Sequence, residues 1–196
     1  MKERKETISP LKANLLSFVL LFVATIVCGG LFVLSLYLND SLNVEFVIST
    51  MPLDIARWAF YLVVAIILVV GMLVHELIHG VVAAIFAKNG FKSISFGAHW
   101  KYLMFYCHCS EPLKVGQYNI VLLAPLVILG IIPAIVGIII LNPYWELFGI
   151  CFITVAIGDI MVAWKLRKEN PENTILDHPS EPGYLVYEPE EDDVKE

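Results

Sequence analysis

Charged residues are scarce in this sequence, and several long stretches have almost none. Asp, Glu, Lys and Arg make up 16% of the 196 residues, whereas about 25% is usual in a soluble domain. Hydrophobic residues reach 58%, above the roughly 45–50% of soluble proteins. This composition indicates a protein of the lipid bilayer.

Three other features are missing, and each absence argues against a class of protein. The sequence has no stripe of basic residues that could neutralise phosphates, which argues against a nucleic-acid partner. No C-x-x-C pair occurs among the four cysteines, which argues against a zinc ribbon and a thioredoxin-like site. No cleavable signal peptide is expected, because the first apolar run, residues 15–38, is too long for one.

Four apolar runs are long enough to cross a membrane. They cover residues 15–38, 55–87, 120–141 and 147–164. A helix rises about 1.5 Å per residue, so about 20 residues cross a hydrocarbon core about 30 Å thick. We therefore predict an all-α membrane protein with four transmembrane helices.

Lysine and arginine residues mark one side of these predicted spans. They occur before the first span, between the second and third, and after the fourth, but not in residues 39–54 or 142–146. Such residues concentrate in the cytoplasmic loops of membrane proteins. The pattern places both termini and residues 88–117 in the cytoplasm.

Outside the spans, the sequence predicts a small insert and an acidic tail. Aromatic and β-branched residues around Gly97 favour a short cytoplasmic β-hairpin, and Glu111-Pro112 marks a turn after it. The tail is rich in Pro, Glu and Asp, which favours an extended or disordered segment. The predicted parts are a cytoplasmic segment 1–14, a transmembrane domain 15–168 with the insert 88–117, and the tail 169–196.

The most informative motif is H-E-L-I-H, in which His75, Glu76 and His79 lie inside the second apolar run. Positions i and i+4 of a helix share one face, so both imidazoles can bind one Zn²⁺. Glu76 lies beside the first ligand, where it can take a proton from water that zinc has acidified. The pattern is typical of zinc metalloproteases, with Glu76 as the catalytic base.

The alternative is that these three side chains only pack within a helix. Ionisable groups are costly inside a membrane and usually have a function there. Three of them within five residues need a partner, and a divalent cation supplies one. We therefore favour a metal site. Gly80 follows directly and would let a neighbouring helix or a substrate backbone approach closely.

A catalytic zinc site needs a third protein ligand, and Asp159 is the only acid in the other three predicted spans. It lies about 9 Å from the cytoplasmic end of its helix, and His79 lies about 14 Å from the same side. These depths are compatible with one site formed by His75, His79 and Asp159, and Gly158 would allow close helix approach. The alternative is an aspartate that reaches the interface or bonds to a neighbouring helix.

Other polar residues have simpler explanations than chemistry. Strand alternation would put Cys107 and Cys109 on one face and His108 on the other, which argues against a second metal site. The tail stretch 177–179, with His178, could fold back as a gate, but a solvated tail is simpler. Asn119 could donate a hydrogen bond to a substrate carbonyl, or be an ordinary interfacial residue.

Residues 75–80, reading H-E-L-I-H-G, together with Gly158-Asp159 in a later span, resemble the site-2-protease-like intramembrane zinc metalloproteases. The chain is also similar to a bacterial family of putative zincin peptidases, a resemblance that implies a location in a bacterial inner membrane. The likeness covers about residues 57–164. It implies a three-helix catalytic core, a β-rich insert after the motif helix, here residues 91–111, and an aspartate as the third ligand, here Asp159.

Together, the residues and the resemblance predict a membrane zinc metalloendopeptidase that cleaves membrane-associated or transmembrane peptides. Two other hypotheses stay open. The first is a non-catalytic membrane scaffold that keeps the metal but needs no base. The second is a small ion carrier, which would need no cleavage and would fit the ionisable residues within the spans.

Overall fold

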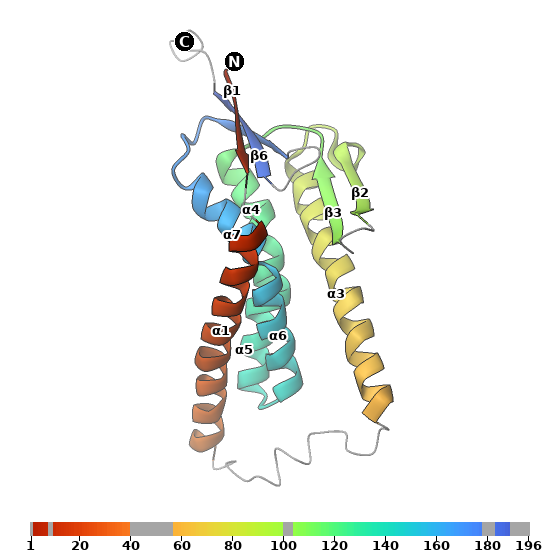
Figure 1. Ribbon diagram of the computed structural model, residues 1–196, viewed down its shortest axis with the longest axis vertical. Coiled ribbons are helices and arrows are strands. Elements are labelled where there is room, and N and C mark those ends of the chain that lie inside the picture. Colours follow the sequence, from red (N-terminus) through yellow and green to blue (C-terminus); the bar gives the residue numbers. More distant parts are fainter. Residues whose placement is uncertain (1, 8–9, 40–56, 100–103, 178–182, 189–196) are drawn as a thin grey trace. The chain divides into compact units, whose positions relative to one another are not determined.

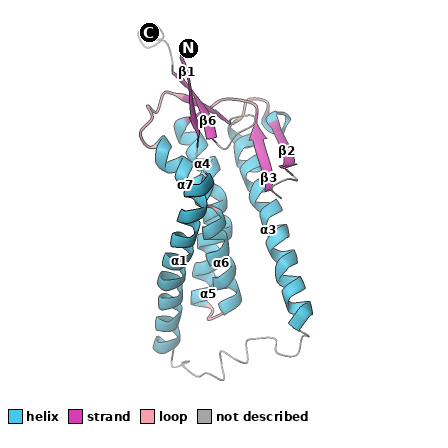
Figure 2. Cartoon of the chain, viewed as in Figure 1, coloured by secondary structure: helices cyan, strands magenta, loops and turns pink. Residues whose placement is uncertain are grey.

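The computed structural model describes residues 2–7, 10–39, 57–99, 104–177 and 183–188. Its elements are, in chain order, β1 (Lys2–Thr7), α1 (Pro10–Leu38), α3 (Arg57–Phe86), the 3-10 helix η1 (Gly90–Ser93), β2 (Ile94–His99), β3 (Met104–Cys109), β4 (Leu113–Lys114), α4 (Val115–Pro125), the π-helix η2 (Leu126–Ile131), α5 (Ile132–Ile139), α6 (Pro143–Val155), α7 (Ile157–Leu166), β5 (Thr174–Asp177) and β6 (Gly183–Glu188). Figure 1 follows this order by colour, and Figure 2 separates helices from strands.

Three segments are long and apolar enough to cross a membrane, namely Leu15–Leu38, Leu62–Phe86 and Val115–Ile139. They correspond to the first three predicted runs, although the third begins earlier than predicted. The fourth predicted run corresponds to α6 and α7, which count as one further span only if the bent pair is taken together. The break lies at Ala156, whose ψ of 7° departs from the helical value of about −42°.

Prolines and a wide turn interrupt the third segment. Pro125 ends α4, η2 follows as a π-helix, and Pro133 lies in the first turn of α5. Proline has no backbone N–H and removes one hydrogen bond of the regular helix. Such breaks favour a local π turn, which keeps the remaining backbone groups paired.

Large apolar side chains are exposed along α1 and α3. Residues 62–70 of α3 are all exposed, so this part of the helix presents apolar groups on every side. Water-soluble proteins rarely expose apolar surface on this scale, and a helix that is apolar all round is typical of a membrane span. The exposure supports a lipid environment for these helices.

The predicted hairpin is confirmed. Strands β2 and β3 pair antiparallel, with Ile94 opposite Cys109 and His99 opposite Met104. The backbone N–H of Ser110 continues the ladder by donating to the carbonyl of Ser93 at 2.9 Å. The connection, residues 100–103, lies outside the described part of the chain.

A second sheet was not predicted, and it corrects the expectation of an all-α fold with a single hairpin. Its strand order is β1-β6-β5-β4, so the N-terminal segment pairs with the tail, and the tail pairs with the short strand that precedes α4. The prediction that the tail is extended or disordered is wrong for residues 174–177 and 183–188. Alternate side chains of these strands are buried, including Ile175 at 0%, Tyr184 at 1% and Val186 at 0% exposure.

These buried strand residues belong to a hydrophobic core shared with the helices. The core joins the C-terminal end of α3, the first turns of α4, the end of α7 and the strands β3 to β6. Its members are Ala83, Ala87, Cys109, Leu113, Val115, Tyr118, Val121, Leu122, Leu166, Ile175, Tyr184 and Val186. Burial of the tail in this core explains why an acidic, proline-containing segment is folded.

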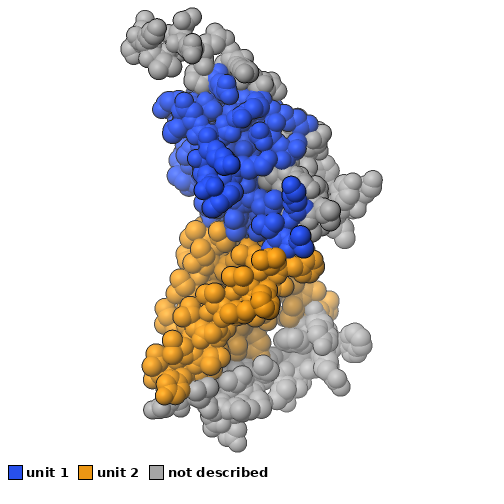
Figure 3. Space-filling model, turned by 60° about the vertical axis from the view of Figure 1, so that its left-hand side comes forward, with its two compact units in different colours: residues 1–16, 75–125, 156–196 blue, residues 17–74, 126–155 orange. Residues whose placement is uncertain are grey.

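The described chain forms two compact units, coloured separately in Figure 3. One contains residues 1–16, 75–125 and 156–196, and the other contains residues 17–74 and 126–155. In the second unit, glycines bring α5 and α6 into backbone contact. A Cβ at Gly137 would lie 2.3 Å from the backbone nitrogen of Glu146, and one at Gly149 would lie 2.4 Å from that of Ala134. Small residues allow such close helix approach within membranes.

Candidate metal centre

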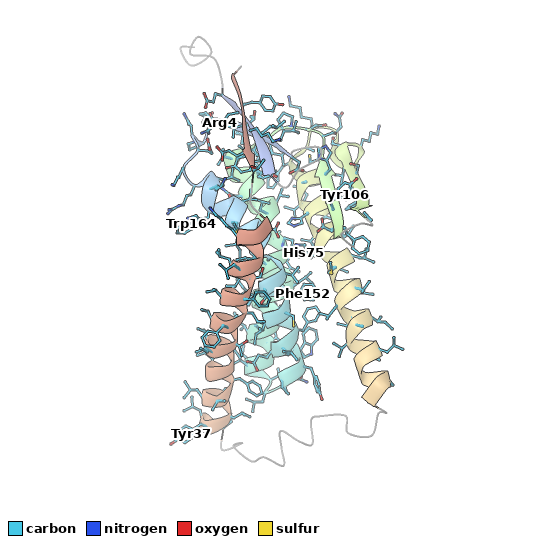
Figure 4. The ribbon with its side chains drawn as sticks, in the orientation of Figure 1. Arg4, Tyr37, His75, Tyr106, Phe152 and Trp164 are labelled. Carbon is cyan, nitrogen blue, oxygen red and sulfur yellow. The ribbon has the colours of Figure 1, made fainter. Side chains whose placement is uncertain are left out.

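Helix α3 carries both histidines of the H-E-L-I-H motif on one face. The ring centroids of His75 and His79 lie 4.8 Å apart in an edge-to-face arrangement. Their spacing, just over one helical turn, brings the two Nε2 atoms to 3.2 Å from each other. His75, which is labelled in Figure 4, is 5% exposed.

Asp159 brings a carboxylate to the same point from the first turn of α7. Its Oδ2 lies 3.1 Å from Nε2 of His75 and 3.5 Å from Nε2 of His79. All three side chains are mostly buried, and the carboxylate, at 21%, is the most exposed of them. The fold therefore brings the three predicted ligands together, although 84 positions separate His75 from Asp159.

The spacing of these three ligand atoms suits a tetrahedral zinc site. Bonds of about 2.0–2.1 Å at tetrahedral angles place ligand atoms about 3.3 Å apart. The separations are 3.1, 3.2 and 3.5 Å. Within the described ranges, this is the one group of three or more His, Cys, Asp or Glu side chains that could hold a metal ion. Three protein ligands are also the number that a catalytic zinc uses.

A backbone contact sets the orientation of the His79 ring. Its Nδ1 lies 2.9 Å from the carbonyl oxygen of Val121 in α4. Because a carbonyl only accepts, Nδ1 carries the proton, and in the neutral ring Nε2 keeps a lone pair that is available to a cation. Metal-binding histidines commonly donate their second ring N–H in this way. The donor set therefore fits a cation at the point where the three atoms converge.

Glu76 follows His75 directly in α3, and its carboxylate interacts electrostatically with His79, His75 and Asp159. It also interacts electrostatically with the thiol of Cys107 in β3. Glu76 is not one of the three converging groups. A carboxylate beside the ligands, but outside them, is compatible with the predicted role of Glu76 as general base, which stays a prediction.

Gly80 allows close approach, but the partner is the hairpin and not the helix or substrate backbone that was predicted. A Cβ at this position would lie 2.5 Å from Cζ of Phe96 and 3.2 Å from Cγ2 of Ile94, both in β2. The hairpin thus packs on α3 one residue after His79. The corresponding prediction for Gly158 is wrong, because no described residue lies within 4 Å of a Cβ built there.

The hairpin cysteines do not form a second metal site among the described residues. Burial raises the pKa of Cys107 to about 12, with smaller contributions from Glu76 and Asp177. Burial also raises the pKa of Cys109. Thiols with raised pKa values stay protonated and are poor metal ligands. His108 faces a different group, with Nδ1 lying 3.9 Å from Oδ2 of Asp177.

Two of the weaker candidates have different outcomes. His178 lies outside the described residues. Asn119 lies in α4, and its Oδ1 is buried without a hydrogen-bond partner in the part of the chain that the structure describes. Its role as a donor to substrate stays a prediction.

Sequence reasoning missed the structural roles of two acidic residues that form hydrogen bonds to the elements around the site. Asp177 bonds to β3 and α4, and Glu111 bonds to the segment that follows α3. Glu111 accepts from the backbone N–H groups of Lys88 and Asn89 and from the hydroxyl of Ser93. The run Y-L-V-Y at residues 184–187 has strand propensity and was a signal for a strand in the tail, but no sequence pattern marked the contacts of Asp177.

Comparison with known proteins gives one match. A family model described as "Putative zincin peptidase" matches residues 66–174, which is more than half of the chain and includes the motif, the hairpin and Asp159. No curated protein and no solved structure matches the chain.

Proposed function

This chain belongs to the putative zincin peptidase family, and from that membership we propose that it is an intramembrane zinc metallopeptidase. Family membership supports the general part of this proposal, namely that the protein is a metallopeptidase. The single observation that carries the rest is the convergence of His75, His79 and Asp159 at tetrahedral spacing. His75 and His79 lie in a helix apolar enough to cross a membrane, and Asp159 lies in α7, which reaches that length only together with α6.

In the proposed mechanism the chain supplies the ligands and the proton transfers. His75, His79 and Asp159 would hold the zinc, which would supply Lewis-acid chemistry by polarising a peptide carbonyl and lowering the pKa of a water molecule. Glu76 accepts a proton from that water as its oxygen bonds to the carbonyl carbon. Glu76 then delivers the proton to the amide nitrogen as the C–N bond breaks. Val121 keeps the His79 ring oriented throughout, through its carbonyl.

We propose that both termini lie in the cytoplasm. The distribution of lysine and arginine supports this orientation. The pairing of β1 with β6 also supports it, because N-terminal and C-terminal strands in one sheet must lie on the same side of the membrane. Termini on one side require an even number of spans, which favours counting α6 and α7 as a fourth span.

The proposed substrate is a membrane-associated or transmembrane peptide that binds in extended form to β3. In the described chain, β3 pairs only with β2, so its other edge has no strand partner. Asp177 already accepts from the N–H of Cys109 on that edge, which leaves the part of the edge around Phe105 for a peptide. A peptide added along this edge would run toward the proposed base, held by backbone hydrogen bonds.

The test is replacement of Glu76 by Gln, which keeps the shape but removes the base. Purified protein in detergent, with zinc, would be assayed against a library of quenched fluorescent peptides. We expect a loss of at least about a hundredfold in cleavage rate, the lower end for general acid–base catalysis, with zinc still bound. Cleavage that persists unchanged in Glu76→Gln would reject the enzyme and favour the scaffold hypothesis.

A further inference from the structure

The side chain of Asp177 connects three parts of the chain near the site. It is the last residue of β5, and its Oδ2 accepts a hydrogen bond from the backbone N–H of Cys109 in β3 at 3.0 Å. Its Oδ1 accepts a hydrogen bond from the hydroxyl of Tyr118 in α4. The imidazole of His108 lies 3.9 Å from Oδ2. One carboxylate thus bonds to a strand and a helix that are not consecutive in the sequence.

Each of these two elements lies beside one functional group of the candidate site. In β3, the thiol of Cys107 interacts electrostatically with Glu76, two residues before the N–H that donates to Asp177. Helix α4 contacts the ring of His79 through the carbonyl of Val121, nearly one turn after Tyr118. Asp177 therefore joins the helix that orients one proposed ligand to the strand that lies near the proposed base.

The strand that carries Asp177 is a fixed part of the fold. β5 lies between β4 and β6 in the sheet, and Ile175 beside Asp177 is fully buried. Cys109 and Tyr118, which donate to the carboxylate, are 4% and 6% exposed. A displaceable lid would not be packed into the core in this way. The arrangement favours a permanent structural contact over a segment that opens and closes.

We propose that Asp177 is a positioning residue for the metallopeptidase site. It holds β3 and α4 in the register that aims Glu76 at the attacking water and His79 at the metal. The expected effect of Asp177 on catalysis rests on the proposed function. Its expected effects on zinc binding and on the stability of β3 do not depend on catalysis.

The experiment compares Asp177→Ala, which removes both bonds, with Tyr118→Phe, which removes only the bond to α4. Glu172→Gln is the matched control, because it removes one negative charge from the same tail and only an exposed contact with Lys114 at 3.4 Å. The measurements are zinc affinity by chelator competition, amide hydrogen exchange of β3, and kcat and KM on the best library peptide.

For Asp177→Ala we expect zinc affinity and kcat each to fall by about tenfold or more, the usual effect of losing a group that orients a ligand. KM should change little, and the amide of Cys109 should lose protection while α5 and α6 keep theirs. Tyr118→Phe should weaken zinc binding with less effect on β3. If Asp177→Ala does not fold, Tyr118→Phe alone tests the contact between Asp177 and α4. A zinc affinity of Tyr118→Phe equal to that of the wild type would then overturn the proposal.

The two proposals fail in different ways. If the wild type and Glu76→Gln are equally inactive, the proposed function fails. The zinc affinity and the amide hydrogen exchange of β3 in Asp177→Ala still test the positioning role. If wild type is active and Asp177→Ala matches the control in zinc affinity, exchange and kcat, the positioning role is wrong and the enzyme stands.

Discussion

Nε2 of His75 lies 3.1 Å from Oδ2 of Asp159, in two helices that are far apart in the sequence. Nε2 of His79 completes a triangle with these two atoms. In a protein without metal, such a group would have to share protons to be stable, whereas a divalent cation satisfies all three at once. The proposed zinc site and the predictions below follow from this arrangement.

The first prediction concerns removal of the metal. A ligand that binds only the folded state stabilises it by about 2.7 kcal/mol at a hundred times its Kd. We therefore expect a chelator to lower the melting temperature of the wild-type protein in detergent, and added zinc to restore it. In Asp159→Asn, which weakens the site, the chelator should have little effect. Equal responses of the two proteins would contradict a role for Asp159 in zinc binding.

The second prediction concerns pH and the segment that follows α3. Hydrogen bonds from Ser93, from Asn89 and from the backbone N–H of Lys88 lower the pKa of Glu111 below 4.5. Because the folded pKa is lowered, ionised Glu111 contributes stability above 4.5, and this is lost as the pH falls through the folded value.

Glu111→Gln should therefore have a lower melting temperature than the wild type at neutral pH. The difference in melting temperature should shrink as the pH falls well below 4.5. Thermal melts of both proteins across that pH range are the measurement, with Glu172→Gln as an exposed control. A difference that is independent of pH would show that the ionised carboxylate does not stabilise this segment.

The third prediction concerns packing and does not depend on function. Gly149→Ala would place a methyl group 2.4 Å from a backbone nitrogen and 2.6 Å from the carbonyl oxygen of Gly130, so α5 and α6 must separate. Overpacking of this kind costs about 1–3 kcal/mol. Gly29→Ala in α1 is the control, since nothing lies within 4 Å of its added Cβ. Melting temperatures in detergent should fall for Gly149→Ala only, and an unchanged value would mean that the two helices are not in contact at this glycine.

The fourth prediction concerns the edge of β3. The N–H of Cys109 points away from β2, and alternation along the strand makes the N–H of Phe105 point the same way. Phe105→Pro removes this donor without breaking the β2–β3 ladder, whereas Phe105→Ala keeps it. On a cleaved peptide, KM should rise for Phe105→Pro well beyond its value for Phe105→Ala. The same KM in both variants would rule out backbone pairing at this position.

The metal ligands could be predicted from the sequence because bilayer physics restricts where ionisable groups occur. His75 and His79 share a helix face by their spacing, and Asp159 was the one acid left within the other spans. The hairpin was predictable too, because its residues have strong strand propensity and a glycine near the turn.

The four-stranded sheet could not be predicted in the same way. Its strands come from opposite ends of the chain, and β4 has only two residues, so no local pattern marks it. The tail composition favoured disorder, but burial of Ile175, Tyr184 and Val186 outweighs it. The roles of Asp177 and Glu111 depend on these tertiary contacts, and so could not be read from spacing along the sequence.

The most direct test of the central claim is the zinc content of the purified protein, measured by plasma mass spectrometry beside His75→Ala, Asp159→Ala and Glu76→Gln. We predict one zinc per chain in the wild type and in Glu76→Gln, and far less than one in His75→Ala and Asp159→Ala. Equal zinc in all four proteins, or none in the wild type after purification with zinc, would contradict a metal centre formed by His75, His79 and Asp159.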